Sequence, residues 1–362
     1  KRRGSRWLDT PLSSVFGFLK VVATTMGAQG PAATLLTKLA SDGVDPKQCD
    51  PENFSKCQDK GLTATSYENY SITSKTYDQS RGPRAGHIVL GLMSAGMPVC
   101  PGGDTGLPKA LSEQRVLDLG CGTGNYLVPL WGVVGEYVGM DLNFGMLEQA
   151  REKLGRLQHQ SPTPVTIASF SHGSMDQIPF EDDSFDAVTL HQTIHHLPPD
   201  QGYELLRKTF HECRRVLKKG GVMIINDSTA EQMDKGFWWT AVVPAALKRI
   251  QERFPLKNLE DPILRNFSRE AGLEYGGLDI PFDATLQTPA VYHDVQGPFS
   301  KVYRDGDSTW SLATKAELES GLAAHKQRID SGEIGAWMAE REGLRKQFGQ
   351  IYFFHAFKRE DS

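Results

Sequence analysis

The sequence predicts an α/β fold, with a mostly parallel seven-stranded sheet and helices on both of its faces. Short apolar runs typical of strands alternate with longer segments of helical periodicity, and this alternation implies parallel strands joined by helices. The first apolar run, residues 116–119, leads directly into a turn with three glycines, Gly120, Gly122 and Gly124. Open α/β sheets bind ligands at the carboxyl ends of their strands. This glycine loop is therefore the first candidate for a binding site.

Each element is expected from its own residue pattern. Five apolar runs predict the first strands: Val116–Leu119, Tyr137–Met140, Val165–Ala168, Ala187–Leu190 and Val222–Ile225. A later run, Gln350–Phe357, predicts the final strand. Helices are expected near 143–157 and 201–217, because apolar residues recur there at the spacing of one helix face.

The length of the chain, 362 residues, exceeds the roughly 250–300 residues at which single cores stop growing. We expect a core at 111–280, preceded by a partly helical N-terminal extension at 1–110. A helical insertion at 281–348 contains the capping-box pattern Thr314 to Glu317, which opens a helix. This insertion is interpreted as a lid or an assembly surface. Residues 349–362 supply the final strand and a tail.

Composition argues against several classes of protein. Hydrophobic residues make up 39% of the chain and charged residues 23%, as in ordinary globular proteins. The net charge of −4 argues against a nucleic-acid partner, which would favour a basic surface. No run approaches the roughly 18 apolar residues of a membrane span. The five cysteines show no CxxC spacing, so no metal site is expected.

The first 41 residues contain six Lys or Arg residues and one acid, Asp9. A basic, acid-poor segment of this kind is typical of an organelle-targeting remnant. A cytoplasmic location and an organellar one, in a plastid or mitochondrion, both stay open.

The spacing of the glycine loop indicates which ligand suits it. The dinucleotide fingerprint G-x-G-x-x-G would place its third glycine at position 125. The chain has Asn125 there, and the glycine comes one residue early, at Gly124. Asp118, just before the loop, is a poor neighbour for a pyrophosphate but suits an ammonium or sulfonium group. An NAD-type oxidoreductase is therefore disfavoured.

Four ordered motifs resemble those of the class I S-adenosylmethionine (SAM) methyltransferases, in the small-molecule, type 11-like group. The first is the strand and glycine loop at 117–124, and the second is a strand that ends in Asp141, 23 residues after Asp118. The third, residues 174–188, is similar to the family pattern "D-x-x-x-L-P-F…s-F-D-x-V". The fourth, residues 214–221, is similar to "R-V-L-K-P-G-G". This resemblance implies a Rossmann-like core with SAM as cofactor and S-adenosylhomocysteine as product. It also implies that Phe267–Leu273 forms the family's last helix and Tyr275–Ile280 its sixth strand.

The resemblance also implies roles for individual residues. Those expected to hold SAM are Asp118, Gly120, Cys121, Gly122 and Gly124 at its methionine end, Asp141 at the ribose, Leu142 beside the adenine, and His191 near the methyl group. Ser174 replaces the usual adenine-binding aspartate, with the Met175 backbone beside it. Tyr77 and Arg81 are expected to close over the SAM carboxylate, although an ordinary surface turn is the alternative interpretation.

Methyl transfer from a sulfonium needs no metal, and positioning alone can supply roughly 7–11 kcal/mol. The residues expected nearest the methyl group are the histidines after the fourth strand. His191 is the first catalytic candidate, because imidazole titrates near neutral pH. His195 and His196 are further candidates, although the "H-H-L" sequence they belong to is widespread in the family and is also interpreted as structural.

Phe237, Trp238 and Trp239 follow the fifth strand, where the family places acceptor-binding elements. Their aromatic faces suit a planar or cationic acceptor, and the alternative interpretation is a lid packed on the core. The sequence therefore leads first to a SAM-dependent methyltransferase acting on a small molecule. The second hypothesis is a structural or assembly subunit of a larger organellar complex, contacting a protein partner through the N-terminal extension or the 281–348 insertion.

Overall fold

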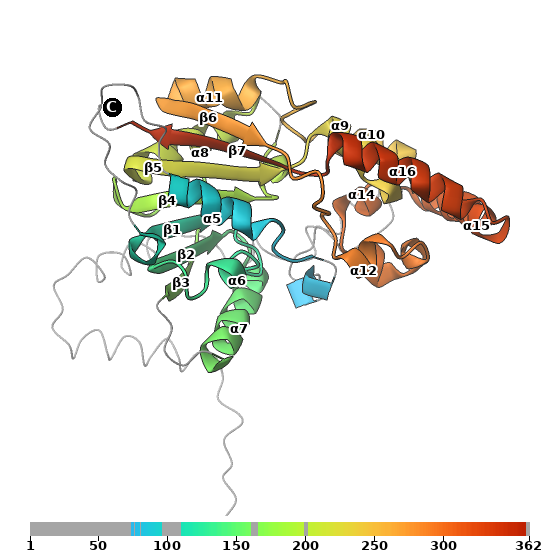
Figure 1. Cartoon of the computed structure of the whole chain (residues 1–362), viewed down its shortest axis with the longest axis horizontal. Helices are drawn as coiled ribbons and strands as arrows, with labels where there is room; N and C mark the ends of the chain where they lie inside the picture. The colour runs from blue at the N-terminus through green and yellow to red at the C-terminus, as the bar shows by residue number, and fades with distance from the viewer. Residues whose placement is uncertain are drawn as a thin grey trace, which may run out of the picture. The chain divides into compact units, whose positions relative to one another are not determined.

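Seven strands form one sheet in the order β3-β2-β1-β4-β5-β7-β6 (Figure 1). The computed structural model describes residues 74–75, 77–79, 81–95, 110–160, 166–198 and 202–359. The basic N-terminal segment lies outside these ranges. The strands are β1 Arg115–Leu119, β2 Glu136–Asp141, β3 Ile167–His172, β4 Phe185–His191, β5 Leu217–Asp227, β6 Leu273–Asp279 and β7 Tyr352–Lys358.

The sheet is parallel from β3 to β5, whereas β7 runs antiparallel to both β5 and β6. The predicted fold is confirmed, with a shift in the third strand, which ends at His172 rather than at Ala168. Strand order reverses between β1 and β4, since β2 and β3 lie on one side of β1 and β4 and β5 on the other. Such a reversal opens a crevice at the carboxyl ends of the strands, and the glycine loop follows β1 at this point.

Alternation along the strands creates two separate cores, one on each face of the sheet. Val116 belongs to a cluster with Val89 and Met93, two residues of helix α5 Gly86–Ala95. Leu117 belongs to a second cluster with Phe210 of helix α8 Glu204–Val216. Figure 1 shows α5 lying across the front of the strands. Helices therefore cover both faces, as predicted.

The remaining core helices connect the strands at the expected places. They are α6 Leu127–Leu130, α7 Phe144–Gln160, α9 Ala230–Gly236, α10 Pro244–Gln251 and α11 Ile263–Ala271. Helix α11 packs on α8 and β6 and ends at Gly272 in the left-handed region. No helix among these described segments is long and apolar enough to cross a bilayer.

The segment between β6 and β7 is helical, with five helices in the part of the chain that the structure describes. They are α12 Pro289–Tyr292, α13 Lys301–Arg304, α14 Ser308–Ser311, α15 Lys315–Asp330 and α16 Ile334–Phe348. Thr314 and Glu317 form the predicted capping box at the start of α15. The helices lie beyond the carboxyl ends of the parallel strands (Figure 1), and α16 packs on α9. The insertion is thus placed next to the crevice.

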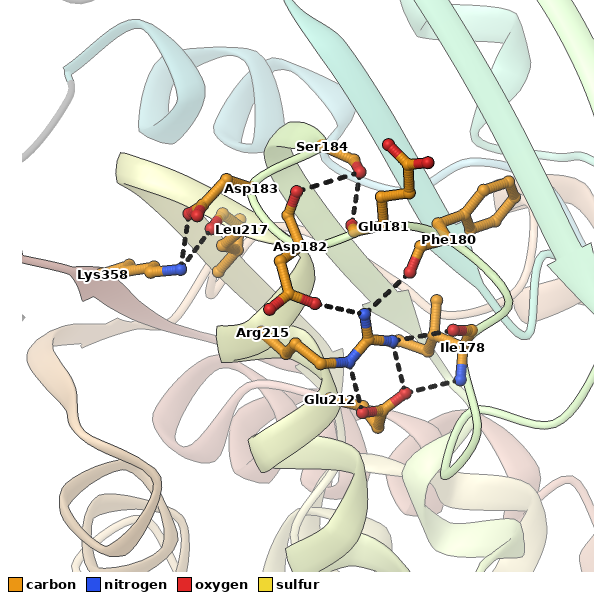
Figure 2. A network of polar contacts seen from close by, with 10 residues as sticks. All are labelled: Ile178, Phe180, Glu181, Asp182, Asp183, Ser184, Glu212, Arg215, Leu217 and Lys358. Atoms are coloured by element: carbon orange, nitrogen blue, oxygen red, sulfur yellow. Dashed lines mark hydrogen bonds and ion pairs between the residues drawn. The ribbon is translucent and has the colours of Figure 1, made fainter.

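The fourth motif contributes a polar network at the opposite ends of β4 and β5 (Figure 2). Arg215 donates from Nη2 to the Ile178 carbonyl and from Nη1 to the Phe180 carbonyl, both at 2.8 Å. Glu212 accepts from Arg215 and also from the Ile178 amide. Lys358, near the C-terminus, donates to Asp183 at 2.7 Å. The motif therefore fixes the loop that enters β4, and its contacts lie away from the crevice.

Candidate functional site

The glycine loop adopts a backbone that only glycine tolerates well. Gly120, Gly122 and Gly124 have φ values of +68°, +55° and +72°. A Cβ at Gly120 would lie 2.3 Å from Thr193 Oγ1, and one at Gly124 would lie 3.2 Å from Ala150. A Cβ at Gly122 would meet no atom within 4 Å. Gly120 and Gly124 are therefore set by packing, whereas Gly122 borders open space.

Asp141 joins this loop to the end of β2. Its Oδ2 accepts from the Gly122 amide at 2.8 Å, and its Oδ1 accepts from the Asn143 amide at 2.8 Å. Burial raises the pKa of this carboxyl. Each carboxylate oxygen has room for a further hydrogen bond, so the pair of oxygens suits two neighbouring hydroxyls such as those of a ribose. Open space at Gly122 and spare acceptors at Asp141 fit the nucleoside part of SAM.

Asp118 is buried in β1 and already has two partners. Tyr137 donates to its Oδ2 at 2.6 Å, and Thr189 donates to its Oδ1 at 3.2 Å. Burial raises the pKa of Asp118 to about 7, with Asp141 adding to the rise. A carboxyl in this state gains from a nearby cation, because positive charge favours its ionised form. The predicted attraction for an ammonium or sulfonium has a physical basis here.

The predicted adenine side lies at the ends of β2 and β3. Leu142 is 65% exposed, and the nearby Phe144 ring stacks on His172 at 4.0 Å. Ser174 donates its hydroxyl to Asp176. The sequence comparison with the family pattern missed Asp176, because this aspartate lies two residues after the usual position. The turn therefore still carries a carboxylate, while Met175 lies partly buried beside it.

The N-terminal segment reaches both the glycine loop and the insertion. Asp78 accepts from Thr123 at 2.6 Å and pairs with Lys153 at 2.9 Å. Tyr77 accepts from the Arg81 amide at 3.1 Å. The Arg81 guanidinium donates to the Gly306 carbonyl at 2.8 Å and to Asp307 at 3.2 Å. Arg81 thus connects this segment to the insertion, and its role at the SAM carboxylate stays a prediction, as does that of Tyr77.

The three candidate histidines lie in different surroundings. His191 ends β4, and its ring stacks on Tyr126 at 3.4 Å. Neither ring nitrogen of His191 has a hydrogen-bond partner among the described residues. Burial lowers the pKa of His191 to about 3, so the ring is neutral. His195 is held through Nδ1 by Asp227 at 2.9 Å, whereas His196 is exposed.

The contact between Asp227 and His195 was not expected from the sequence, although Asp227 is the last residue of β5. Register alone could have suggested it, because β4 and β5 are adjacent parallel strands whose ends meet. Cys121, also expected near SAM, is buried, and burial raises the pKa of its thiol well above the usual range. No group of three His, Cys, Asp or Glu residues is arranged as a metal site in the described ranges.

Phe237, Trp238 and Trp239 are buried rather than displayed. The Trp238 indole donates to the Tyr292 carbonyl at 2.7 Å, and the Trp239 indole donates to Asp307 at 3.0 Å. Both partners belong to the insertion. This arrangement favours the alternative interpretation, a lid packed on the core, because the rings and their N–H groups are already occupied.

A glycine loop after β1, an acid at the end of β2 and a reversal of strand order between β1 and β4 are typical of Rossmann-like domains that bind an adenosyl cofactor. Residues 117–225 match the family described as "Methyltransferase domain". The matched stretch spans β1 to β5 and is similar to the SAM-dependent methyltransferases, whose cofactor is SAM.

Curated relatives support the same assignment. An uncharacterised methyltransferase of Schizosaccharomyces pombe is 33% identical over 117 residues, covering 32% of this chain and 40% of the relative. A demethylmenaquinone methyltransferase of Staphylococcus aureus is 33% identical over 124 residues, covering 33% of this chain and 44% of the relative. The chain thus matches less than half the length of these relatives.

A solved structure shows a similar fold across most of the described chain. It is a protein described as "Putative methyltransferase from antibiotic biosynthesis pathway" of Anabaena variabilis. The TM-score is 0.54 at 17% identity, with 76% of this chain and 98% of that chain covered.

Proposed function

We propose that this protein transfers a methyl group from SAM to a small-molecule acceptor bound between the sheet and the 281–348 insertion. The observation that carries the proposal is the pairing of Asp141 with the Gly122 amide beside open space. The insertion lies beyond the same edge of the sheet (Figure 1), where it can enclose an acceptor. A relative is named for demethylmenaquinone, which supports a small acceptor.

The residues proposed to hold the cofactor are Asp118, Gly120, Cys121, Gly122, Gly124, Asp141, Leu142, Ser174 and Met175. When bound, SAM supplies a methyl carbon that accepts a lone pair from the acceptor while the carbon–sulfur bond breaks toward sulfur. Asp118 favours the positive charge at this end of the site, and Asp141 fixes the ribose. These contacts align the reacting atoms, which is the main requirement of the reaction.

The histidines are assigned different parts of the acceptor side. A general base works best with a pKa near the working pH, so neutral His191, with its pKa near 3, is proposed as a hydrogen-bonding contact. His195 is the candidate base for an acceptor that loses a proton. Asp227 orients its ring through Nδ1 and would stabilise the imidazolium that forms.

The alternative is an assembly subunit that binds SAM and turns it over slowly or not at all. The two are separated by incubating the purified chain with methyl-labelled SAM and an extract of small metabolites. Label in the small-molecule fraction, lost in Asp141→Ala, supports the enzyme. SAM binding by calorimetry without transfer of label supports the assembly subunit, and absence of SAM binding contradicts both.

A further inference from the structure

Two buried side-chain nitrogens without a hydrogen-bond partner among the described residues come from the insertion and from the segment before α5. Gln287, which lies in the insertion before α12, is fully buried. Its Oε1 accepts weakly from the Tyr303 hydroxyl at 3.4 Å. Its Nε2 has no hydrogen-bond partner among the described residues. An unsatisfied buried amide is destabilising, and a ligand that accepts a hydrogen bond from Nε2 would remove this cost.

The guanidinium of Arg84, a partly buried residue before α5, reaches the backbone next to Gln287. Arg84 donates from Nε to the Leu286 carbonyl at 3.3 Å, next in sequence to Gln287. Its Nη2 is buried and has no partner in the described ranges. Burial lowers the pKa of Arg84, with a contribution from the neighbouring Arg81. A ligand anion would relieve both effects.

A chain of contacts connects these groups to the methyl-transfer side. The Tyr126 hydroxyl lies 3.0 Å from the Arg84 carbonyl and 3.2 Å from Asn226 Oδ1. The Tyr126 ring stacks on His191, whose nitrogens also have no partner among the described residues. The free groups of Arg84 and Gln287 are donors only, and one of them is charged.

We propose that Arg84 and Gln287 form a subsite for a negatively charged oxygen of the methyl acceptor, such as a carboxylate or a phenolate. This inference rests on the proposed function. Gln287 belongs to the insertion rather than to the SAM-binding core, which favours the acceptor as the source of this oxygen. A different cation lies beside the glycine loop: Lys153 of α7 forms an ion pair with Asp78 at 2.9 Å.

The test compares acids with amides of the same shape. Calorimetry is performed on the full chain saturated with S-adenosylhomocysteine, using benzoate against benzamide and acetate against acetamide as probes. We expect at least one acid to bind tenfold or more tightly than its amide. Equal affinity for both acid–amide pairs would overturn the subsite.

Variants at Gln287 identify the residue responsible. Gln287→Glu should reduce the affinity for the acid tenfold or more and leave that for S-adenosylhomocysteine unchanged. Gln287→Leu, which removes the orphaned amide and should fold at least as well, should lower the preference for the acid. Gln296→Glu makes the same change on the exposed surface of the insertion and serves as the control. Equal behaviour of Gln287→Glu and Gln296→Glu contradicts the proposal.

A second experiment compares SAM with decarboxylated SAM, to test whether the bound oxygen belongs to the cofactor instead of the acceptor. If the subsite binds the carboxylate of SAM, Gln287→Glu will lower the affinity for SAM and leave the affinity for decarboxylated SAM unchanged. The proposal is then wrong. If the wild-type chain binds neither SAM nor decarboxylated SAM, the proposed function itself is contradicted. Cofactor binding without a preference for acids contradicts only this inference.

Discussion

The two halves of the crevice differ in the kind of group they offer. The half formed by β1 and β2 presents carboxylates and glycine backbone, with Asp118, Gly122 and Asp141 close together. The half formed by β4, β5 and the insertion contains imidazoles and buried nitrogens without partners in the described ranges, among them those of His191 and Gln287. A cationic sulfonium suits the first half and an electron-rich acceptor the second. In the proposed function, the first half therefore binds the methyl donor and the second half binds the acceptor.

Replacing Asp141 should have the largest effect, and it acts on the donor half alone. Asp141→Ala removes the proposed contacts to two ribose hydroxyls and the hydrogen bond to the Gly122 amide. Loss of charged hydrogen bonds worth about 3 kcal/mol corresponds to a Kd for SAM weakened roughly a hundredfold. Calorimetry with SAM measures this change. A Kd within threefold of the wild type would show that the ribose lies elsewhere.

Gly122→Ala tests whether the open space beside the loop holds the cofactor. Its φ of +55° makes any side chain unfavourable by about 1–2 kcal/mol. Gly132→Ala is a matched control, because Gly132 has φ +76° and its Cβ would also meet no atom within 4 Å. Both variants should lose similar unfolding free energy. Only Gly122→Ala should weaken the binding of SAM, by about 2 kcal/mol or roughly thirtyfold in Kd, because the alanine methyl group enters the space proposed for the cofactor. Equal Kd values for the two variants would contradict this placement.

His191→Phe tests the acceptor half without disturbing the donor half. Phenylalanine keeps the ring that stacks on Tyr126 and removes two buried nitrogens without partners in the described chain. Unfolding free energy should therefore stay the same or rise by about 1 kcal/mol. Methyl transfer should fall roughly tenfold through loss of a hydrogen bond to the acceptor, with the Kd for SAM unchanged. Full activity in this variant would remove His191 from the acceptor site.

The conformation of the glycine loop and the position of Asp141 could be predicted from the sequence, whereas the contacts in the acceptor half could not, and the reason is physical. Glycine at 120, 122 and 124 is required by local backbone geometry, and Asp141 follows from its place at the end of a strand, so both leave a local pattern. The partners of His195 and Arg84 lie 32 and 202 residues away. Contacts of this kind depend on register and on the packing of the insertion, which no short pattern records. Phe237–Trp239 illustrate the same limit, since an exposed and a buried aromatic run look alike in sequence.

The smallest predicted effect concerns Asp118 and pH. Its folded-state pKa is raised from 3.8 to about 7, so the folded protein holds this proton more tightly than the unfolded chain does. The stability it contributes is therefore fully present below pH 3.8 and is lost as the pH rises toward 7. Binding of a cation favours the ionised form, so SAM affinity should increase roughly fivefold between pH 6 and pH 8. Asp118→Asn, which cannot ionise, corrects for titration of the amino group of SAM itself. A pH dependence of SAM affinity equal in the wild type and in Asp118→Asn would show that Asp118 does not interact with the cationic end of the cofactor.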